Sequence, residues 1–363
     1  MKLITAGESH GKAIAGILEN VPSGFNIDEN FINSELAARQ SGYGRGGRQK
    51  IENDKINILS GIKNGKTTGA PIAFTIENKD YNAFYGEEKL TKVRPGHADL
   101  SGMIKYNVSD IRDIAERASA RATAAIVAGG AVAKQFLSDF GISITGYVRS
   151  VYNIEDKNEY GFEQIKKSRS EKLRMMSREN EACAAIDALR ENGDTAGGIV
   201  EIRVKGLKIG FGSCMEYGKK LDADLAAKFM SIQAVKGVEI GKGFALSKMK
   251  GSEARDAVFF DGNFKRKSNN SGGIEGGISD GEEIVIRAAM KPLPTVSSDE
   301  KTTVDFITKE ETASDYIRSD TAAVTALEVI LENAAALTVS DTITERLGGD
   351  NMEDITGRWR KLP

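Results

Sequence analysis

Short apolar segments alternate with glycine-rich or charged segments along this chain, and their periods predict a mixture of strands and helices. Two-residue alternation, or continuous apolar runs bounded by turn residues, predicts strands over residues 3–6, 13–18, 51–61, 142–147, 197–204, 234–241 and 284–290. Apolar residues at three- and four-residue spacing predict helices over residues 28–40, 110–137, 171–191, 221–233 and 321–337. Strands and helices therefore intermix along the sequence, and there is no tandem repeat.

The composition narrows the class of protein. The chain has 363 residues, of which 40% are hydrophobic and 28% charged, as in soluble globular proteins. A net charge of −2 argues against nucleic acid or an anionic membrane as the main partner. The N-terminal segment lacks the apolar core of a signal peptide, and no apolar run approaches the length of a membrane span. The two cysteines form no disulfide framework, so we expect a cytoplasmic protein.

The segment from residue 94 to 134 contains a histidine motif followed by a predicted helix. It contains His97, one of two histidines, in the motif Arg-Pro-Gly-His-Ala-Asp at residues 94–99. Ser109 and Asp110 are good N-cap residues for the helix predicted to run to about residue 137. That helix is rich in Ala and Gly, and such small side chains allow another backbone or a flat ligand to approach closely.

Two arginines on this predicted helix suggest a binding function. Arg117 and Arg121 stand four residues apart, and two like charges at this spacing cost about 0.2–0.5 kcal/mol on an isolated helix. Either an anion lies between them, or Asp113 and Glu116 neutralise them on a solvated face. The spacing alone leaves both interpretations open.

The second histidine, His10, follows the first predicted strand in the motif Gly-Glu-Ser-His-Gly at residues 7–11. Its neighbours Ser9 and Gly11 provide no apolar face on which a core histidine would pack. Loops at strand ends commonly carry functional residues. We therefore interpret His10 as a candidate for chemistry, although a histidine chosen at random is more often structural.

A glycine- and arginine-rich loop follows the helix predicted over residues 28–40. It presents Arg39, Arg45 and Arg48 among several glycines. A dozen residues between a helix and a strand favour an ordered loop that offers guanidinium groups to anions over a disordered RNA-binding tail. A merely solvated loop is the alternative.

Residues 61–67 resemble a nucleotide-binding P-loop, but the match fails. Ser60 stands where the first glycine of that motif belongs, and the following residues predict a turn and strand where a P-loop requires a helix. A hairpin is the better interpretation.

A second glycine-rich segment, residues 268–277, offers backbone N–H groups that a phosphate or flavin ring could use, or is simply a surface loop. The prolines after Lys291 predict an extended corner that fixes its position. Asp320 precedes the last long predicted helix and could be its N-cap. Two histidines without cysteine or carboxylate at metal spacing predict no metal site, and the serine-hydrolase motif is absent.

Seven short motifs then identify a family. In order along the chain they are residues 7–11, 94–99, 119–121 (Ser-Ala-Arg), 234–237 (Ala-Val-Lys-Gly), 272–277 (Gly-Gly-Ile-Glu-Gly-Gly), 291–292 (Lys-Pro) and 318–320 (Arg-Ser-Asp). Each motif is weak alone, but the seven in this order resemble chorismate synthase from residue 3 to about 337. The Arg-rich loop looks like the form found in Gram-positive members.

The resemblance implies a fold and a reaction. The fold is a β-α-β sandwich of the α+β class, with helices between antiparallel sheets, forming a single domain over residues 1–363 with its core at about 3–337 and a tail at about 338–363. The reaction removes phosphate and the ring C6 proton from 5-enolpyruvylshikimate 3-phosphate to give chorismate. It requires reduced FMN without net redox change, with NADPH as an indirect source of electrons in some members. The family assembles as a homotetramer.

The resemblance also implies roles for residues. The cofactor would contact Arg117, Ala118, Ser119, Gln233, Ala234, Gly276, Lys291, Pro292, Leu293, Pro294, Thr295 and Arg318, and also Arg39 and Arg45. The phosphate and two carboxylates of the substrate would be bound by Arg39, Arg45, Arg48, Arg94 and Arg121. His10 would be the acid beside the leaving phosphate and His97 would protonate or hydrogen-bond the flavin, although these two roles could be exchanged. Ser9 and Asp320 would assist proton removal.

The sequence departs from the family's pattern at a few positions. Ala122 replaces a usual Glu, and Asn107 replaces a usual Gly. Glu19-Asn20 stands where Asp-Gly is common, and Thr321-Ala322 stands where Pro-Cys is usual. None of these positions has a proposed chemical role. Two rival functions remain: a flavin oxidoreductase that consumes NAD(P)H, which lacks a dinucleotide motif here, and a non-enzymatic polyanion-binding module that uses residues 39–50.

Overall fold

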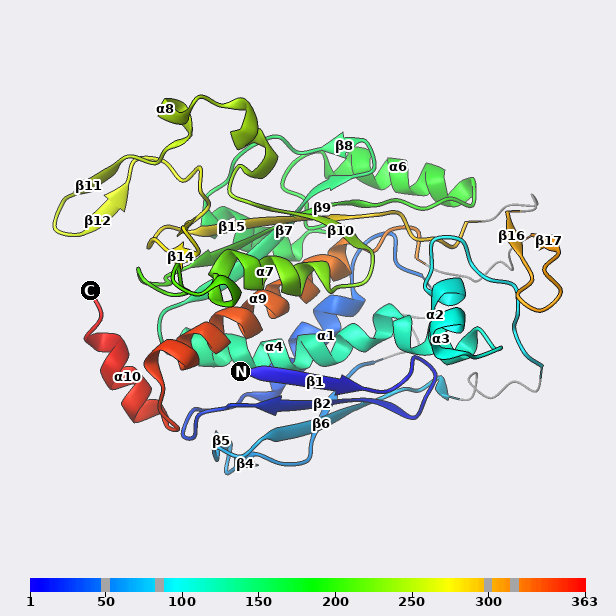
Figure 1. Cartoon of the computed structure of the whole chain (residues 1–363), viewed down its shortest axis with the longest axis horizontal. Coiled ribbons are helices and arrows are strands. Elements are labelled where there is room, and N and C mark those ends of the chain that lie inside the picture. The colour runs from blue at the N-terminus through cyan, green and yellow to red at the C-terminus, as the bar shows by residue number, and fades with distance from the viewer. Residues whose placement is uncertain (47–52, 82–87, 297–301, 314–319) are drawn as a thin grey trace.

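Two antiparallel sheets enclose a layer of helices (Figure 1). The computed structural model of the chain describes residues 1–46, 53–81, 88–296, 302–313 and 320–363. The first sheet has the strand order β1 (Lys2–Ala6), β2 (Ala13–Glu19), β6 (Ile72–Glu77), β3 (Ile56–Ile58). The second has the order β10 (Val235–Ile240), β15 (Ile284–Met290), β9 (Gly198–Lys205), β7 (Ser143–Val151), β8 (Ile154–Glu155). The predicted sandwich of the α+β class is confirmed.

The layer between the sheets consists of α1 (Glu29–Gln40), α4 (Thr123–Ser138), α7 (Leu221–Met230) and α9 (Val324–Leu347). Adjacent glycines in α4 face its two neighbours. A Cβ atom on Gly130 would lie 2.4 Å from the Cβ of Asn333 in α9, and one on Gly129 would lie 3.2 Å from Leu3 in β1. The small residues of this helix therefore allow close packing by other protein elements, which is one of the two uses that the sequence left open.

The remaining elements lie around this sandwich. Outer helices are α2 (Asp99–Tyr106), α3 (Arg112–Ala118), α5 (Phe162–Lys167), α6 (Glu179–Glu191), α8 (Gly251–Ala254) and α10 (Met352–Arg360). Short hairpins are β4 (Ile62–Lys63) with β5 (Lys66–Thr67), β11 (Val258–Phe260) with β12 (Phe264–Arg266), β13 (Ile274–Glu275) with β14 (Ile278–Ser279), and β16 (Thr303–Val304) with β17 (Glu311–Thr312). The hairpin predicted in place of a P-loop is confirmed as β4–β5.

The helix predicted over residues 110–137 is wrong as a single element, because the chain breaks at Ser119. Ser119 is extended (ψ 143°), and its hydroxyl accepts a hydrogen bond from the Arg121 N–H at the start of a short 3-10 turn, Ala120–Ala122. The Ala120 carbonyl accepts from the Arg39 guanidinium and from the Thr123 hydroxyl. Tertiary contacts thus override the helical pattern, and the predicted i,i+4 arginine pair does not form.

Three other predicted boundaries need correction. The helix expected over residues 171–191 begins only at Glu179, because Arg174 and Arg178 have positive φ angles of 56° and 60°. The last long helix begins at Val324 and has no side-chain cap, so the interpretation of Asp320 as its N-cap is wrong. This helix also continues to Leu347, and Trp359 of α10 belongs to the main hydrophobic core, so residues beyond 337 pack against the rest.

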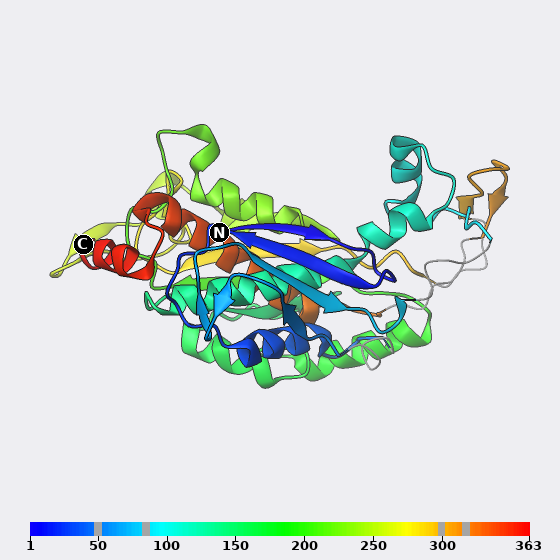
Figure 2. The same ribbon diagram turned by 90° about the horizontal axis from the view of Figure 1, so that it is seen from below.

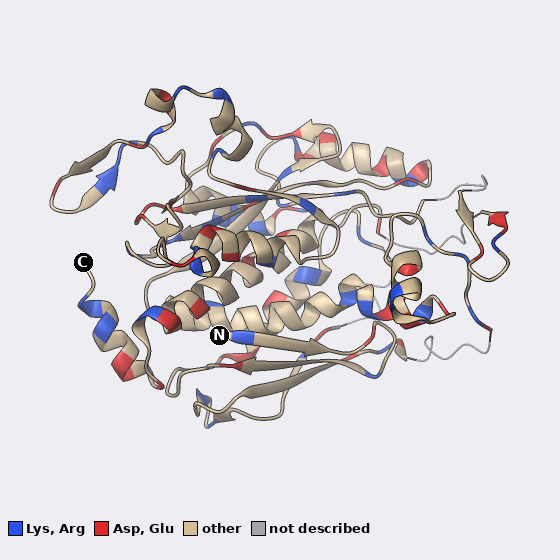
Figure 3. Ribbon diagram, in the orientation of Figure 1, with Lys and Arg blue, Asp and Glu red and all other residues tan. Residues whose placement is uncertain are grey.

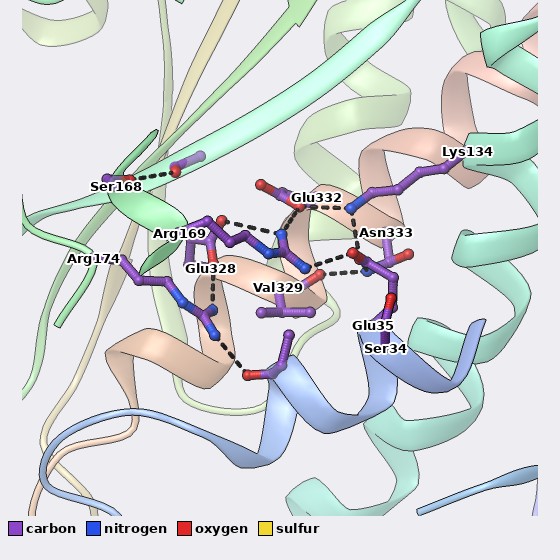
Figure 4. Close-up of polar contacts among 12 residues, drawn as sticks. Ser34, Glu35, Lys134, Ser168, Arg169, Arg174, Glu328, Val329, Glu332 and Asn333 are labelled. Carbon is purple, nitrogen blue, oxygen red and sulfur yellow. Dashed lines mark hydrogen bonds and ion pairs between the residues drawn. The ribbon is translucent and has the colours of Figure 1, made fainter. Parts of the chain in front are cut away.

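A buried ionic network lies where α1, α4 and α9 meet (Figure 4). Lys134 donates to Glu35 at 2.7 Å and to Glu332 at 2.6 Å, and Arg169 binds the same two carboxylates at 2.5 Å each. Arg174 pairs with Glu328 at 2.5 Å. These contacts fix the register of the three helices, since each buried charge has an opposite charge beside it.

The two glutamates of α9 differ within this network. Burial is the main cause that raises the pKa of Glu328 to about 8, and the neighbouring Glu332 carboxylate adds to it. Burial acts on Glu332 in the same direction, but Arg169 and Lys134 outweigh it and hold the pKa of Glu332 below its usual range.

The two sheets differ in charge (Figure 3). In the first sheet, charged residues occur only at strand ends, namely Lys2, Glu19 and Glu77. The second sheet carries a buried Glu201 that pairs with arginines of β7, β9 and β15. Seen from below, α2, α3 and the β16–β17 hairpin project from one end of the sandwich (Figure 2). They share a small hydrophobic cluster formed by Val93, Met103, Ile111 and Ile114. No described helix is long and apolar enough to cross a membrane.

Candidate active site

The loop that carries His10 is fixed between β1 and helix α3. Gly7 has φ 106°, and a Cβ atom there would lie 2.4 Å from the Ala13 carbonyl, so the turn requires glycine. The Ser9 N–H donates to the Glu116 carbonyl at 3.1 Å. Both the peptide N–H and the ring Nδ1 of His10 contact the Glu116 carboxylate, at 2.6 and 2.8 Å. The strand-end loop predicted for this histidine is confirmed.

Ser9 is buried and contacts a second serine. The Ser119 hydroxyl donates to the Ser9 hydroxyl at 3.2 Å. The break in the predicted helix at Ser119 makes this contact possible, because it turns the chain toward the loop. The Asn78 side chain supports the same loop by donating to the carbonyls of Glu8 and Gly11, at 3.0 and 2.7 Å. Residues that are distant in sequence therefore hold this loop rigidly.

Arg39 and Arg121 share one carboxylate beneath the loop. Arg121 binds Asp54 at 2.5 and 2.7 Å and Asn78 at 2.7 Å, while Arg39 binds Asp54 at 3.3 Å and Thr123 at 2.9 Å. Both arginines are buried. Burial lowers the pKa of Arg39 to about 10, although Asp54 favours its charged form. Among the described residues, both guanidinium groups therefore bind the same buried carboxylate.

Arg45 and Asp320 form a second ion pair at this end of the molecule. Arg45 contacts Asp320 at 2.7 Å, and the other Asp320 oxygen accepts from the Gly46 N–H at 2.5 Å. Burial lowers the pKa of Arg45. The Arg45 Nε–H is buried and has no hydrogen-bond partner. A buried guanidinium donor without a partner is the feature expected of an anion site whose ligand is not part of the chain.

His97 lies in the turn before α2 and is held by Asp99. The distance from His97 Nδ1 to Asp99 Oδ1 is 2.5 Å. Arg94 binds both oxygens of the same carboxylate, at 2.7 and 2.8 Å. Burial favours the neutral form of Asp99, but the hydrogen bonds from Arg94 and His97 outweigh it and hold the pKa of Asp99 below its usual range. Arg94 is therefore committed to Asp99 in this structure.

The Lys291 corner reaches the turn that carries His97. The Lys291 ammonium donates to the Gly96 carbonyl, and the Lys291 N–H donates to the Ala234 carbonyl at 2.9 Å. Ala234 has φ 67°, which is uncommon for a residue other than glycine. The Oε1 atom of neighbouring Gln233 is buried without a partner. Pro292, Leu293, Pro294 and Thr295 follow this corner. The Leu293 carbonyl accepts from the Thr195 hydroxyl at 2.7 Å.

The remaining predicted residues divide into three groups. Arg117 and Ala118 end α3 beside the first strand, where the Arg117 guanidinium donates to the Thr5 carbonyl at 3.0 Å. Gly276 lies in the β13–β14 hairpin, at the opposite end of α7 and β15 from Lys291 (Figure 1). Strand β15 alone extends about 20 Å at roughly 3.3 Å per residue, so one chain does not bring Gly276 and Lys291 together. Arg48 and Arg318 lie outside the described residues.

Sequence reasoning missed several residues of this site. Glu116 was considered only as a neutralising charge, yet it holds His10. Asp54 and Asn78 carried no local signal, because their partners lie 15–70 residues away in the sequence. Asp99 was part of a motif, and its spacing of two residues from His97 was the available signal.

The departures from the family's pattern have a simple structural account. Asn107 and Asn20 have φ angles of 53° and 57°, in the left-handed region that glycine adopts freely and asparagine tolerates. Ala122 is buried beneath the helix layer. The Thr321 backbone N–H donates to the Gly44 carbonyl at 2.9 Å, a hydrogen bond that the family's usual proline at this position could not make.

Comparisons with known proteins agree with this arrangement. The family model described as chorismate synthase matches residues 1–344. A chorismate synthase of Thermoanaerobacter pseudethanolicus is 46% identical over 359 residues, covering 98% of this chain and 96% of that protein. One of Geobacter sulfurreducens is 46% identical over 379 residues, with the same shares covered. A crystal structure of chorismate synthase matches with a TM-score of 0.82 and 38% identity, covering 99% of this chain and 96% of that one. The chain therefore belongs to the chorismate synthase family.

Proposed function

We propose that the end of the molecule that carries His10, His97, Arg45 and Lys291 is the site of the family's reaction. That reaction, the elimination of phosphate and the C6 proton from 5-enolpyruvylshikimate 3-phosphate to give chorismate, is the activity of this lyase. The proposal concerns where and with which residues the chain performs it. The buried Arg45 Nε–H, which has no hydrogen-bond partner, carries the proposal most directly, because the substrate has one phosphate and two carboxylates that could accept from it.

Substrate binding is assigned to the arginines of this end. Arg45 can direct its unpartnered Nε–H to an anion while its other nitrogen stays paired with Asp320. Arg39 and Arg121, which both bind Asp54, place two further guanidinium groups next to the loop. Arg94 lies beside His97 and is hydrogen-bonded to Asp99. We therefore expect Arg94 to attract the substrate through its positive charge more than through a direct hydrogen bond. Arg48 completes the predicted substrate set.

Reduced FMN fits the residues next to this cluster. Gln233 Oε1 is a buried acceptor without a partner, and the neighbouring Ala234 has a left-handed backbone. Reduced flavin supplies electron density that assists departure of the phosphate. The residues that would hold it are Arg117, Ala118, Ser119, Gln233, Ala234 and the corner from Lys291 to Thr295, with Arg39, Arg45 and Arg318 from the surrounding loops.

Proton chemistry is assigned to four residues. His10, with one ring nitrogen on Glu116, can offer the other to the leaving phosphate as an acid. His97, held by Asp99, can protonate or hydrogen-bond the flavin. Ser9 is buried against Ser119, and Asp320 stands at Arg45, where each can assist removal of the C6 proton.

We also propose a homotetramer in which a second copy completes the flavin site. Support comes from Gly276, which the family's pattern assigns to the flavin but which lies at the far end of its own chain from Lys291. Further support comes from the outer face of the first sheet, where Ile4 and Ile17 are paired neighbours and 57% and 43% exposed. Neighbouring copies would cover such a face. We place the protein in the cytoplasm as one domain, with NADPH as an indirect reductant.

Anaerobic turnover tests the proposal. Purified protein is mixed with dithionite-reduced FMN and 5-enolpyruvylshikimate 3-phosphate, and chorismate absorbance and phosphate release are followed together. Equal amounts of both products are expected, with none when FMN stays oxidised. NADPH oxidation by the purified protein with oxidised FMN, measured without dithionite or substrate, tests the rival oxidoreductase. Full turnover of variants His10→Ala and His97→Ala would contradict the assigned site.

A further inference from the structure

We propose that Glu116 is a positioning residue that fixes the tautomer and orientation of the His10 imidazole. The inference rests on the proposed role of His10 and deepens it by identifying what controls that ring. Glu116 is buried, with 8% of its surface exposed, and it lies on α3, which is separated from His10 by 106 residues.

Glu116 contacts His10 at two atoms. Glu116 Oε2 accepts the His10 peptide N–H at 2.6 Å, and Oε1 lies 2.8 Å from the His10 ring Nδ1. Because one rigid carboxylate binds both the backbone and the ring, rotation of the side chain would break the second contact. The α3 backbone contributes as well, since the Glu116 carbonyl accepts from the Ser9 N–H at 3.1 Å.

The carboxylate of Glu116 determines which ring nitrogen of His10 carries the proton. An ionised carboxylate is only an acceptor, so the His10 Nδ1 must carry hydrogen to make this contact. The other ring nitrogen, Nε2, is then the one that exchanges a proton with a ligand.

The other histidine has a different environment. The Asp99 carboxylate beside His97 also binds the Arg94 guanidinium through both oxygens, and an Arg94 nitrogen lies 3.1 Å from His97 Nδ1. The Asp99 carboxylate is therefore shared between an arginine and His97, whereas each oxygen of Glu116 contacts a nitrogen of His10.

The variant Glu116→Gln distinguishes a role in positioning the His10 ring from a role in packing alone. Glu116→Gln has the same shape but only one acceptor. The peptide N–H of His10 is always a donor, so the amide oxygen is expected to bind it and the amide NH2 to face Nδ1. The ring must then accept at Nδ1 and carry its proton on Nε2. The tautomer of His10 is therefore expected to switch while the fold is kept.

Nitrogen NMR of histidine-labelled protein reads this directly, because the chain has only two histidines. The measurement is made on the full chain at a pH where the ring is neutral, and the variant His97→Asn assigns the signals. We expect Nδ1–H in the wild type, Nε2–H in Glu116→Gln, and Nδ1–H again in Glu116→Asp. The variant Asp113→Asn, at an exposed carboxylate on the same helix, is expected to leave both histidines unchanged.

Kinetics provide the second readout. We expect Glu116→Gln to lower kcat by about 10–100-fold with little change in KM, and Glu116→Asp to recover part of the loss. An Nε2–H wild type, or an unchanged tautomer in Glu116→Gln, would overturn the proposal and leave Glu116 as a loop anchor. If the tautomer switches but His10→Ala retains full turnover, the positioning stands and the proposed catalytic role of His10 fails.

Discussion

The buried ionic network between the helices and the arginine cluster at the candidate site both bury cationic side chains but satisfy them differently. In the network, each of Lys134, Arg169 and Arg174 contacts carboxyl groups from α1 and α9 (Figure 4). At the site, two buried arginines share Asp54, and Arg45 keeps a buried Nε–H without a partner.

This difference separates a structural use of charge from a functional one. Cationic side chains that contact carboxyl groups of the same chain hold helices in register, and nothing further is required of them. A buried donor without a partner costs stability, so the Arg45 Nε–H indicates that a ligand supplies the missing acceptor. An orphaned donor is therefore more informative than the number of arginines.

The largest expected effect is on the network. Glu332→Gln removes the carboxylate that Lys134 and Arg169 share, and leaves two buried cations short of negative charge. We expect the free energy of unfolding, measured in urea, to fall by about 3–5 kcal/mol. The matched control is Glu181→Gln, whose exposed pair with Arg178 should change the free energy of unfolding far less, because solvent screens both charges. Equal effects of the two variants would mean that burial does not distinguish these pairs.

A smaller effect is expected from Arg45. Arg45→Lys keeps the charge but loses the planar fork and the Nε–H donor. We expect the KM for the substrate or the Kd for reduced FMN to rise by about 10–100-fold, which corresponds to loss of one hydrogen bond to a charged group. Arg190→Lys, at an exposed arginine, is the control. If Arg45→Lys binds both ligands like the wild type, the unpartnered donor has no role in recognition.

The pH dependence of stability sharpens the comparison inside the network. The folded-state pKa of Glu328 is raised to about 8, above the usual glutamate value of about 4.3. Its contribution to stability is thus fully present below about pH 4 and is lost as the pH rises to about 8. Glu328→Gln imitates the protonated carboxyl, so its stability relative to the wild type should increase from pH 5 to pH 8. Urea unfolding at both values measures this, and a constant difference would contradict it.

The smallest effect is expected at Asn107, where φ is 53°. Asn107→Gly should raise the free energy of unfolding by less than about 1 kcal/mol, since glycine adopts this conformation without strain. Asn107→Ala should lower it by about 1 kcal/mol. Turnover should be unchanged in both variants. A clear loss of activity in Asn107→Gly would mean that the asparagine side chain itself contributes to the site.

Local patterns predicted the elements whose ends are determined locally. The helix α1 begins where Asp28 caps it, and β1 and β2 follow their apolar alternation. The break at Ser119 could not be predicted, because Arg39 and Thr123 bind the Ala120 carbonyl only in the folded chain. For the same reason the motifs identified His10 and His97, but not the Glu116 and Asp54 side chains that hold the site together.

The position of α9 between the sheets also has a consequence for the order of synthesis. Its first residue, Val324, follows the last strand of the first sheet by 247 residues, and its side chains cover one side of α4. At about 5–20 residues per second, the ribosome needs on the order of 10–50 s to supply it. During that interval the nascent chain exposes the apolar face of α4. Chains stalled before residue 324 should therefore bind chaperones and be cleaved by added protease, whereas released full-length chains should resist it.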